Sequence, residues 1–450
     1  MDELVTMERL LHLIETNQWM QLQEELSQHN PVDIANLLQE LDNDKMVLVF
    51  RLLPKDLSAD IFAYMDSEQQ AHIVSSISNL EVNALVDNLF LDDTVDILEE
   101  MPANVVTKIL SSTDAQTRRQ INMLLRYPEN SAGSIMTIEF VDFRESWNVG
   151  QAMAHLRKTA PDSETIHTCY VTDNARKLLG TISLRKLILA DDNEPLAELM
   201  HDNVISVRTL DDQEEVADMV RKYDLMAMPV VDKEDRLVGI ITVDDIVDVI
   251  EEENTEDFEK MAAMLPSDNE YLKTSPWTLA KNRIPWLFIL MISATFTGKI
   301  IQHYNDVLQS AVMLTAFIPM LMDTGGNCGS QASTMIIRGM ALGEVQLSDV
   351  LKVVWKEFRV SILVGVALSA VNFARLLWLE NTGMLVATVV CSSLMLTVII
   401  AKVIGCTLPM LAKKCKLDPA IMASPLITTI VDACSLAIYF LIATRLMGIS

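Results

Sequence analysis

Five apolar stretches in residues 281–450 constrain the fold of this chain more than any other feature. They cover residues 284–301, 311–337, 360–379, 384–408 and 421–446, and each is long enough to cross a hydrocarbon core of about 30 Å as an α-helix. Inside lipid, the backbone satisfies its polar groups only in helices or closed barrels. The sequence therefore predicts a membrane domain of five helices over residues 284–450.

Asp432 lies within the last of these stretches, in the apolar run 421–445. An ionised side chain at bilayer depth costs roughly 2.5–3.5 kcal/mol, so it usually faces a bundle interior or a water pathway. A structural ion pair inside the bundle is the alternative, but no Lys or Arg lies within two helical turns of Asp432 in the sequence. These observations favour a cation site at Asp432.

The second stretch continues into small and amide residues, Asp-Thr-Gly-Gly-Asn-Cys-Gly-Ser-Gln-Ala-Ser-Thr over residues 323–334. At membrane depth such residues either permit close helix packing or line an aqueous passage. Taken alone, the segment favours packing. Pro319 lies one turn earlier and can free a backbone carbonyl, and Pro425 and Asp432 lie on the last stretch. The combination favours a pore.

The charge is divided unevenly along the chain. Residues 1–280 contain 22 Lys and Arg against 54 Asp and Glu, whereas residues 281–450 contain 13 against 8. A soluble part this acidic would be repelled by nucleic acid and by anionic lipid surfaces, so its natural partners are cations. The six cysteines form no Cys-x-x-Cys pair, so neither a disulfide framework nor a zinc site is indicated.

The positive charges of the membrane part predict its orientation. The connection between the second and third stretches and that between the fourth and fifth are basic, with Arg338, Lys352, Lys356, Arg359, Lys413, Lys414 and Lys416. Such loops stay in the cytoplasm. The acidic N-terminus lacks the basic start of a signal peptide. We therefore expect a multi-pass protein of the cell membrane, the inner membrane where there are two, with its N-terminus in the cytoplasm and its C-terminus outside.

The soluble part divides by its periodicity. Residues 1–127 contain short amphipathic segments that begin with Pro, Ser, Asn or Asp, as capped helices do, and these predict a small helical superhelix. In residues 128–256, strand-like runs at 166–172, 178–184, 228–232 and 236–243 alternate with helical stretches. Two half-similar segments, residues 180–187 and 239–246, indicate two related α/β units, which we expect at about 136–199 and 200–256.

Residues 243–260 form the most acidic tract of the chain and lead towards the first apolar stretch. A solvated linker helix is the ordinary interpretation of such a tract. Crowded carboxylates repel one another, however, and bound divalent cations relieve that repulsion. An acidic helix that joins a soluble part to a pore therefore suggests a gate that responds to cations, and we expect a connecting helix over residues 257–283.

The two α/β units resemble a pair of cystathionine-β-synthase (CBS) domains. In that family a Gly-x-x-Thr-x-x-Asp segment can hold the ribose of a nucleotide, and Thr242 and Asp245 match it in the second unit. The first unit has Ser183 and Lys186 at these positions. The resemblance thus implies at most one such nucleotide site, and ATP is a candidate ligand.

The whole chain resembles the MgtE family of magnesium channels, on its domain order, the Gly326-Asn327-x-Gly329-x-Gln331 segment and Asp432. The resemblance implies a homodimer with its pore on the two-fold axis, Mg²⁺ bound at paired copies of Asp432, and closure by cytosolic Mg²⁺. Ser424 stands where relatives commonly have Asn, which bears on selectivity. The implied pore-lining residues are Pro319, Asn327, Gln331, Ser424 and Pro425. The implied regulatory ligands are Asp92, Asp96, Asp212, Glu214, Asp224, Asp245, Asp248, Glu253, Glu256, Asp257 and Asp418.

Three other functions are alternatives to a magnesium channel. An ion-coupled secondary transporter of Co²⁺, Ni²⁺ or Mn²⁺ would also need an intramembrane carboxylate, and Asp323 is the only second one that the stretches offer. A protein that is mainly a nucleotide sensor would respond to ATP without Mg²⁺. No stretch carries a His/Asp, Ser/Lys or His-Glu-x-x-His constellation, so we do not expect an enzyme.

Overall fold

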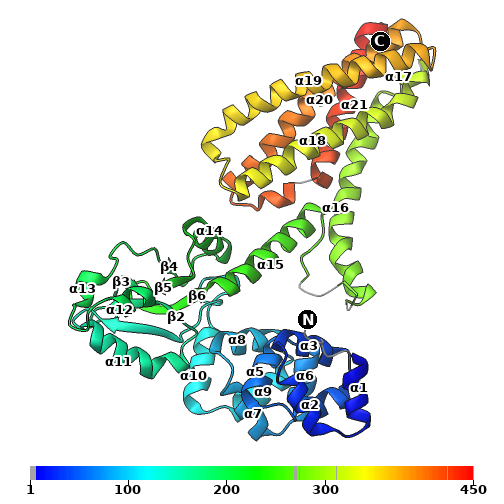
Figure 1. Cartoon of the computed structure of the whole chain (residues 1–450). Helices are drawn as coiled ribbons and strands as arrows, with labels where there is room; N and C mark the ends of the chain where they lie inside the picture. Colours follow the sequence, from blue (N-terminus) through cyan, green and yellow to red (C-terminus); the bar gives the residue numbers. More distant parts are fainter. Residues whose placement is uncertain (1–6, 268–270, 273, 311, 423, 449–450) are drawn as a thin grey trace. The chain divides into compact units, whose positions relative to one another are not determined.

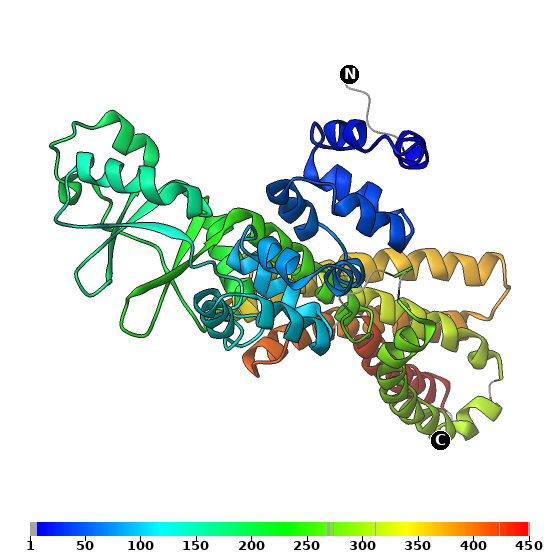
Figure 2. The same ribbon diagram turned by 90° about the horizontal axis from the view of Figure 1, so that it is seen from below.

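The structure is a computed structural model that describes residues 7–267, 271–272, 274–310, 312–422 and 424–448. The chain divides into two compact units, Met1–Ile250 and Glu251–Ser450. The first contains the helical N-terminal part and the two α/β units, and the second contains the long apolar helices (Figures 1 and 2).

The N-terminal part is a series of short helices, as predicted. They are α1 (Met7–Glu15), α2 (Trp19–Leu26), α3 (Pro31–Gln39), α4 (Asn43–Phe50), α5 (Lys55–Ala63), α6 (Ser67–Ser76), α7 (Asn79–Val86), α8 (Leu91–Glu100), α9 (Ala103–Ser112) and α10 (Ala115–Leu124). The side chains of Asn30, Asp42, Ser78 and Asp114 accept hydrogen bonds from the first turns of α3, α4, α7 and α10, which satisfies backbone N–H groups that have no partner inside the helix.

One hydrophobic core joins these helices to the second α/β unit. It runs from Leu10 and Phe62 through Ile121 to Ile241 and Ile246. The same core therefore holds the N-terminal helices against the second sheet, and carboxylates from both parts come together at its edge.

Each α/β unit contains one three-stranded sheet with the same pairing. The first has the order β1-β2-β3 and the second β4-β5-β6; in each, the first pair is parallel and the second antiparallel. The strands are β1 (Phe140–Arg144), β2 (Thr165–Thr172), β3 (Leu178–Ser183), β4 (Val207–Arg208), β5 (Ala227–Val231) and β6 (Leu237–Thr242). The four predicted strands are present, and β1 and β4 are additional strands that the sequence did not suggest.

Short helices connect the strands of the two sheets. They are α11 (Val149–Thr159), η1 (Ala160–Asp162), α12 (Leu184–Leu189), α13 (Leu196–Leu199) and α14 (Gln213–Tyr223). The repeated sheet order supports the interpretation of residues 128–256 as two related units.

The acidic tract forms α15 (Val243–Met261), which follows β6 directly. The predicted connecting helix over residues 257–283 is not one continuous helix, because α15 ends at Met261 and α16 begins at Pro276. Ala263 has a left-handed backbone with φ of +54°, a conformation that ends a right-handed helix. Pro266 then disfavours helical geometry at Leu265. The acidic tract is thus a helix that directly continues the second α/β unit.

Over its described residues, the second unit contains five long helices. They are α16 (Pro276–His303), α18 (Ile318–Ala341), α19 (Val350–Trp378), α20 (Met384–Lys414) and α21 (Ser424–Met447), with the short α17 (Asn305–Ser310), η2 (Val312–Phe317), η3 (Leu347–Asp349) and η4 (Pro419–Met422) between them. Figure 1 shows α18–α21 side by side (yellow to red), and α16 packs on α21.

Within the described residues, four helical segments are long and apolar enough to cross a membrane: those of α16, α19, α20 and α21. The prediction of five membrane helices is therefore confirmed in part. The second predicted stretch does form a long helix, α18, but its small and polar residues lower its hydropathy.

Helix α20 lies at the centre of this bundle, against α18, α19 and α21. Glycines allow the closest approach. A Cβ atom added to Gly405 of α20 would lie 2.2 Å from the carbonyl oxygen of Gly329 on α18, so the two backbones touch without an intervening side chain.

Candidate ion pathway and regulatory carboxylates

Helix α18 carries a polar face that is exposed in the part of the chain that the structure describes. Pro319, Asn327 and Gln331 are exposed and lie at multiples of four residues, which places them along one side of the helix. The opposite side, with Gly325 and Gly329, is buried against the bundle. A polar face on a helix of a membrane bundle faces water or another protein surface rather than lipid.

Asp432 is half-buried on α21, the helix that packs against α18. The α18–α21 contact is antiparallel, because Ser333 Oγ donates a hydrogen bond to Met422 O (3.0 Å) whereas the earlier Gly326 lies against the later Thr428. The structure therefore places the helix of Asp432 directly beside the helix that carries Asn327 and Gln331.

Pro425 lies in the first turn of α21, where its missing N–H is not needed. Its carbonyl accepts hydrogen bonds from Thr428 Oγ1 (2.9 Å) and Thr429 Oγ1 (3.0 Å). Ser424 begins α21, but its side chain lies outside the described residues. The predicted role of Ser424 in the pore thus stays a prediction.

A second set of carboxylates gathers in the first unit. Asp92, in the first turn of α8, is buried, and burial together with the charge of Asp245 raises its pKa well above the usual value. Asp245, in the first turn of α15, also has a raised pKa because of burial. The structure therefore brings together Asp92 and Asp245, and their role as regulatory ligands stays a prediction. Asp96 and Asp248, one turn further along α8 and α15, are exposed.

Three further members of this cluster were missed by the sequence interpretation. Burial and the charge of Asp245 raise the pKa of Asp93 to about 6 and that of Glu164 to about 7. Glu139 accepts a hydrogen bond from Leu91 N (2.9 Å), and burial raises its pKa. The charged groups that act on Glu164 are all carboxylates. The carboxylate cluster, defined as Asp92, Asp93, Glu139, Glu164 and Asp245, thus concentrates negative charge.

The three predicted ligands of α14 do not come together within one chain. Asp212 caps the start of the helix by accepting from Glu214 N (2.9 Å), and Glu214 lies in the first turn. Asp224 ends the same helix in a left-handed conformation. At 1.5 Å per residue, Asp212 and Asp224 are about 18 Å apart along the axis. The three carboxylates therefore belong to two places on the surface.

The proposed nucleotide residues form a local pair. Asp245 Oδ2 accepts a hydrogen bond from Thr242 Oγ1 (2.6 Å) at the junction of β6 and α15. In the first α/β unit, Ser183 Oγ accepts a hydrogen bond from Lys186 N (3.3 Å), which is an ordinary helix cap. The two α/β units thus differ at this position, as the sequence indicated.

The end of α15 lies against the loop before α21 within the second unit. Lys260 Nζ lies 2.7 Å from Asp418 Oδ2 and 2.5 Å from Glu256 Oε1. Burial and the charge of Asp418 raise the pKa of Asp257 to about 6. Glu253, one turn earlier, is half-buried and acts on Asp257 electrostatically. The structure thus brings together Glu256, Asp257 and Asp418, with a lysine among them, and their role as regulatory ligands stays a prediction.

Among the described residues, no three His, Cys, Asp or Glu side chains lie close enough to enclose a bare metal ion. Mg²⁺ keeps several of its waters when a protein binds it through one or two carboxylates. Carboxylates that are near one another without forming a closed cage therefore fit a hydrated Mg²⁺ ion.

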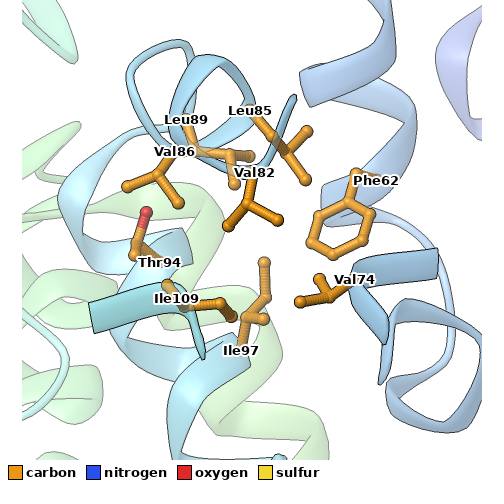
Figure 3. Close-up of a pocket in the computed structure, with 9 residues that line it drawn as sticks. All are labelled: Phe62, Val74, Val82, Leu85, Val86, Leu89, Thr94, Ile97 and Ile109. Atoms are coloured by element: carbon orange, nitrogen blue, oxygen red, sulfur yellow. The ribbon is translucent and has the colours of Figure 1, made fainter. Parts of the chain in front are cut away.

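Figure 3 shows a cavity inside the N-terminal helices. Its volume is about 10 Å³, which is about the room that one water molecule needs. The nine residues that line it are Phe62, Val74, Val82, Leu85, Val86, Leu89, Thr94, Ile97 and Ile109. This cavity is a packing defect of the core rather than a ligand site.

Comparison with known proteins agrees with this arrangement. The sequence matches the MgtE family profile, described as a divalent cation transporter, over residues 318–442; the MgtE intracellular N domain over 29–130; and a CBS domain over 196–252. It is 38% identical over 430 residues to the magnesium transporter MgtE of Thermus thermophilus, which covers 95% of both chains. The chain belongs to the MgtE family. The expectation of a transport protein rather than an enzyme is thereby confirmed.

Two other MgtE proteins extend the comparison. The magnesium transporter MgtE of Bacillus subtilis is 34% identical over 444 residues, which is 98% of this chain and 97% of that one. A crystal structure of the cytosolic domain of the Mg²⁺ channel MgtE in complex with ATP is 38% identical, with a TM-score of 0.52, and covers 54% of this chain and all of that one. The MgtE similarity thus extends over both the soluble and the membrane parts.

Proposed function

We propose that this protein imports Mg²⁺ across the cell membrane and that cytosolic Mg²⁺ closes it. The observation that carries the transport function is the placement of Asp432 beside the exposed polar face of α18, within a bundle of apolar helices. Family membership supports the choice of Mg²⁺, since the relatives that cover nearly the whole chain are magnesium transporters. In this proposal α18 also crosses the membrane, which together with α16, α19, α20 and α21 gives five membrane helices.

The pathway binds Mg²⁺ through the water molecules of the ion's hydration shell. Mg²⁺ dehydrates reluctantly, so a channel gains by accepting the ion with its shell. The Asp432 carboxylate and the amides of Asn327 and Gln331 can accept hydrogen bonds from those waters, which concentrates the ion and still allows it to leave. In a homodimer, the polar faces of two α18 helices would meet across the two-fold axis, and each would be covered by the other.

The carboxylate cluster makes the gate sensitive to cytosolic Mg²⁺. At low cytosolic Mg²⁺, the repulsion among Asp92, Asp93 and Asp245 opposes the packing of the N-terminal helices on the second α/β unit. A bound cation removes that repulsion and favours the compact arrangement. Asp245 lies on α15, which continues into the second unit, so the helix itself links the cluster to the membrane part. Moving the population from 1:99 to 99:1 takes roughly 5.5 kcal/mol, which several weak sites can supply together.

Orientation and nucleotide binding complete the proposal. The soluble part lies in the cytosol, as in the relative whose cytosolic domain aligns with it, and five crossings place the C-terminus outside. ATP binds the second α/β unit at Thr242 and Asp245. This assignment is supported by the ATP complex of the same relative and by the Thr242–Asp245 hydrogen bond.

Magnesium uptake into proteoliposomes tests the function. Wild type and Asp432→Asn are compared at low and high Mg²⁺ on the cytoplasmic face. Asp349→Asn is a charge-matched control, because Asp349 lies just before α19, where it pairs with Lys352, and not on the polar face of α18. We expect uptake in wild type and control, loss of uptake in Asp432→Asn, and suppression by cytoplasmic Mg²⁺. Undiminished uptake in Asp432→Asn would contradict the pore assignment. Strict dependence of uptake on a proton or sodium gradient would favour the ion-coupled transporter.

A further inference from the structure

We propose that Asp323 is a second carboxylate of the ion pathway, which shares the hydrated cation with Asp432 and sets the preference for divalent ions. This inference rests on the proposed function and adds a residue to its pathway. It follows from the faces of α18, from the register of α18 against α21 and from the cost of an exposed carboxylate in a membrane.

The first observation is the position of Asp323 on α18. It lies midway between Pro319 and Asn327, so residues 319, 323, 327 and 331 follow one another at intervals of four, and all are exposed within the single chain. Residues spaced by four lie above one another on a helix face. Asp323 is therefore part of the same polar face as the amides of Asn327 and Gln331.

The second observation is the level of Asp323 within the bundle. Tyr439 Oη donates a hydrogen bond to Leu314 O (2.9 Å) at one end of the antiparallel pair, and a Cβ atom added to Gly326 would lie 3.0 Å from Thr428 Cγ2 nearer the other. Asp323 precedes Gly326 by one turn, and Asp432 follows Thr428 by one turn. In antiparallel helices these two steps lead in the same direction, so Asp323 and Asp432 lie at the same level.

The two carboxylates are also close enough for the charge of Asp323 to act on Asp432. Two like charges at one level of a membrane bundle repel each other, and the repulsion grows as water is excluded. A divalent cation between them neutralises both charges, whereas a monovalent ion leaves a net charge of −1.

Exposure to lipid would make Asp323 costly. A carboxylate at bilayer depth is expensive and almost always faces a bundle interior or a water-filled cavity. The neighbours that bury the other side of α18 leave Asp323 uncovered. The side of α18 that carries Asp323 therefore faces the ion pathway, and a partner chain with the same face would double the number of carboxylates there.

The test measures Mg²⁺ transport by the full-length protein in proteoliposomes with low Mg²⁺ on the cytoplasmic face. The variants are Asp323→Asn, Asp323→Glu and Asp432→Asn, with Asp349→Asn as the matched control. We measure the Mg²⁺ concentration for half-maximal uptake and the reversal potential with K⁺ on one side and Mg²⁺ on the other. Loss of one pathway carboxylate in Asp323→Asn is expected to raise the half-saturating Mg²⁺ concentration about tenfold and to increase K⁺ permeability relative to Mg²⁺.

A structural role for Asp323 would lower the amount of folded protein and leave both quantities unchanged. Unchanged half-saturation and selectivity in Asp323→Asn, with uptake present in wild type and lost in Asp432→Asn, would overturn this inference alone. Absence of Mg²⁺ uptake in wild type would overturn the proposed function as well. If Asp323→Asn does not fold by size-exclusion chromatography, Asp323→Glu decides: a displaced carboxylate must shift the half-saturating concentration, and an unchanged value overturns the inference.

Discussion

Lys260 Nζ lies 2.7 Å from Asp418 Oδ2, so a side chain near the end of α15 is tied to the loop that precedes α21. The same ammonium group contacts Glu256. Burial lowers the pKa of Lys260, but the hydrogen bonds to Asp418 and Glu256 outweigh this effect and hold the pKa above its usual range. Lys260 is therefore a built-in cation among carboxylates that would otherwise attract Mg²⁺.

Replacing Lys260 with Gln should make the gate depend more strongly on magnesium. Without the ammonium group the closed arrangement loses an ion pair of about 0.5–1 kcal/mol, which changes the ratio of open to closed protein by about two- to fivefold. We expect faster Mg²⁺ uptake at low cytoplasmic Mg²⁺ and full inhibition at high Mg²⁺, because Mg²⁺ then binds Glu256 and Asp418. Lys45→Gln, which removes an exposed ion pair with Asp42, is the control. Equal uptake by Lys260→Gln and wild type at low Mg²⁺ would contradict a role of the Lys260–Asp418 ion pair in closing the gate.

Features that depend on neighbouring residues could be predicted from the sequence. Asp432 is recognisable because a carboxylate interrupts an apolar run, and the polar segment after Met322 is recognisable for the same reason. The strand-like runs of the α/β units were also found, since β2 and β6 combine β-branched residues with flanking turns. In each of these cases the sequence pattern and the structural feature that it predicts lie within about one helix or strand.

Features that depend on pairing across the chain could not be predicted. Glu139 and Glu164 lie just before β1 and β2, and they reach Asp93 only because the first sheet lies next to α8. Lys402 lies inside the predicted stretch 384–408, and its partner Glu357, 3.5 Å away on α19, lies 45 residues earlier. Neither relationship has a local sequence pattern.

The pKa values of the carboxylate cluster predict how stability changes with pH. The pKa of Glu164 is raised from 4.5 to about 7 and that of Asp93 to about 6. The folded state therefore binds these protons more tightly than the unfolded state, and the stability they contribute is lost as pH rises from about 4.5 through 7. In the absence of Mg²⁺, we expect the thermal unfolding midpoint of the first unit to fall by a few degrees between pH 5 and pH 8, measured by circular dichroism on the full-length protein in detergent.

Two experiments, addition of Mg²⁺ and the variant Glu164→Gln, distinguish the contribution of the carboxylate cluster from other causes of pH-dependent stability. Mg²⁺ should raise the unfolding midpoint more at pH 8 than at pH 5, because ionised carboxylates bind it better. Glu164→Gln should flatten the pH dependence, whereas Glu145→Gln, at an exposed residue of the same sheet region, should not. A pH profile that is the same in Glu164→Gln and wild type would refute the assignment of the cluster.

Nucleotide binding should depend on the second α/β unit alone. Thr242→Ala removes the hydroxyl that donates to Asp245, and we expect it to weaken ATP binding by about five- to thirtyfold, the loss that corresponds to one hydrogen bond of about 1–2 kcal/mol at a charged group. Ser183→Ala, at the matching position of the first unit, should leave ATP affinity unchanged. Isothermal titration calorimetry with the full-length protein measures both. Equal losses in the two variants would mean that the first unit also binds the nucleotide.

Close packing of α18 and α20 should make Gly405 one of the least replaceable residues of the membrane part. A Cβ atom at Gly405 would lie 2.2 Å from Gly329 O, which is backbone and cannot rotate away. Gly405→Ala must therefore push the two helices apart, at a cost of about 1–3 kcal/mol. We expect a lower thermal midpoint in detergent and reduced Mg²⁺ uptake, since Gly329 lies between Asn327 and Gln331 on α18. Gly298→Ala, where a Cβ atom meets nothing within 4 Å, is the matched control. If Gly405→Ala melted and transported like Gly298→Ala, α18 and α20 would not be in backbone contact in the membrane.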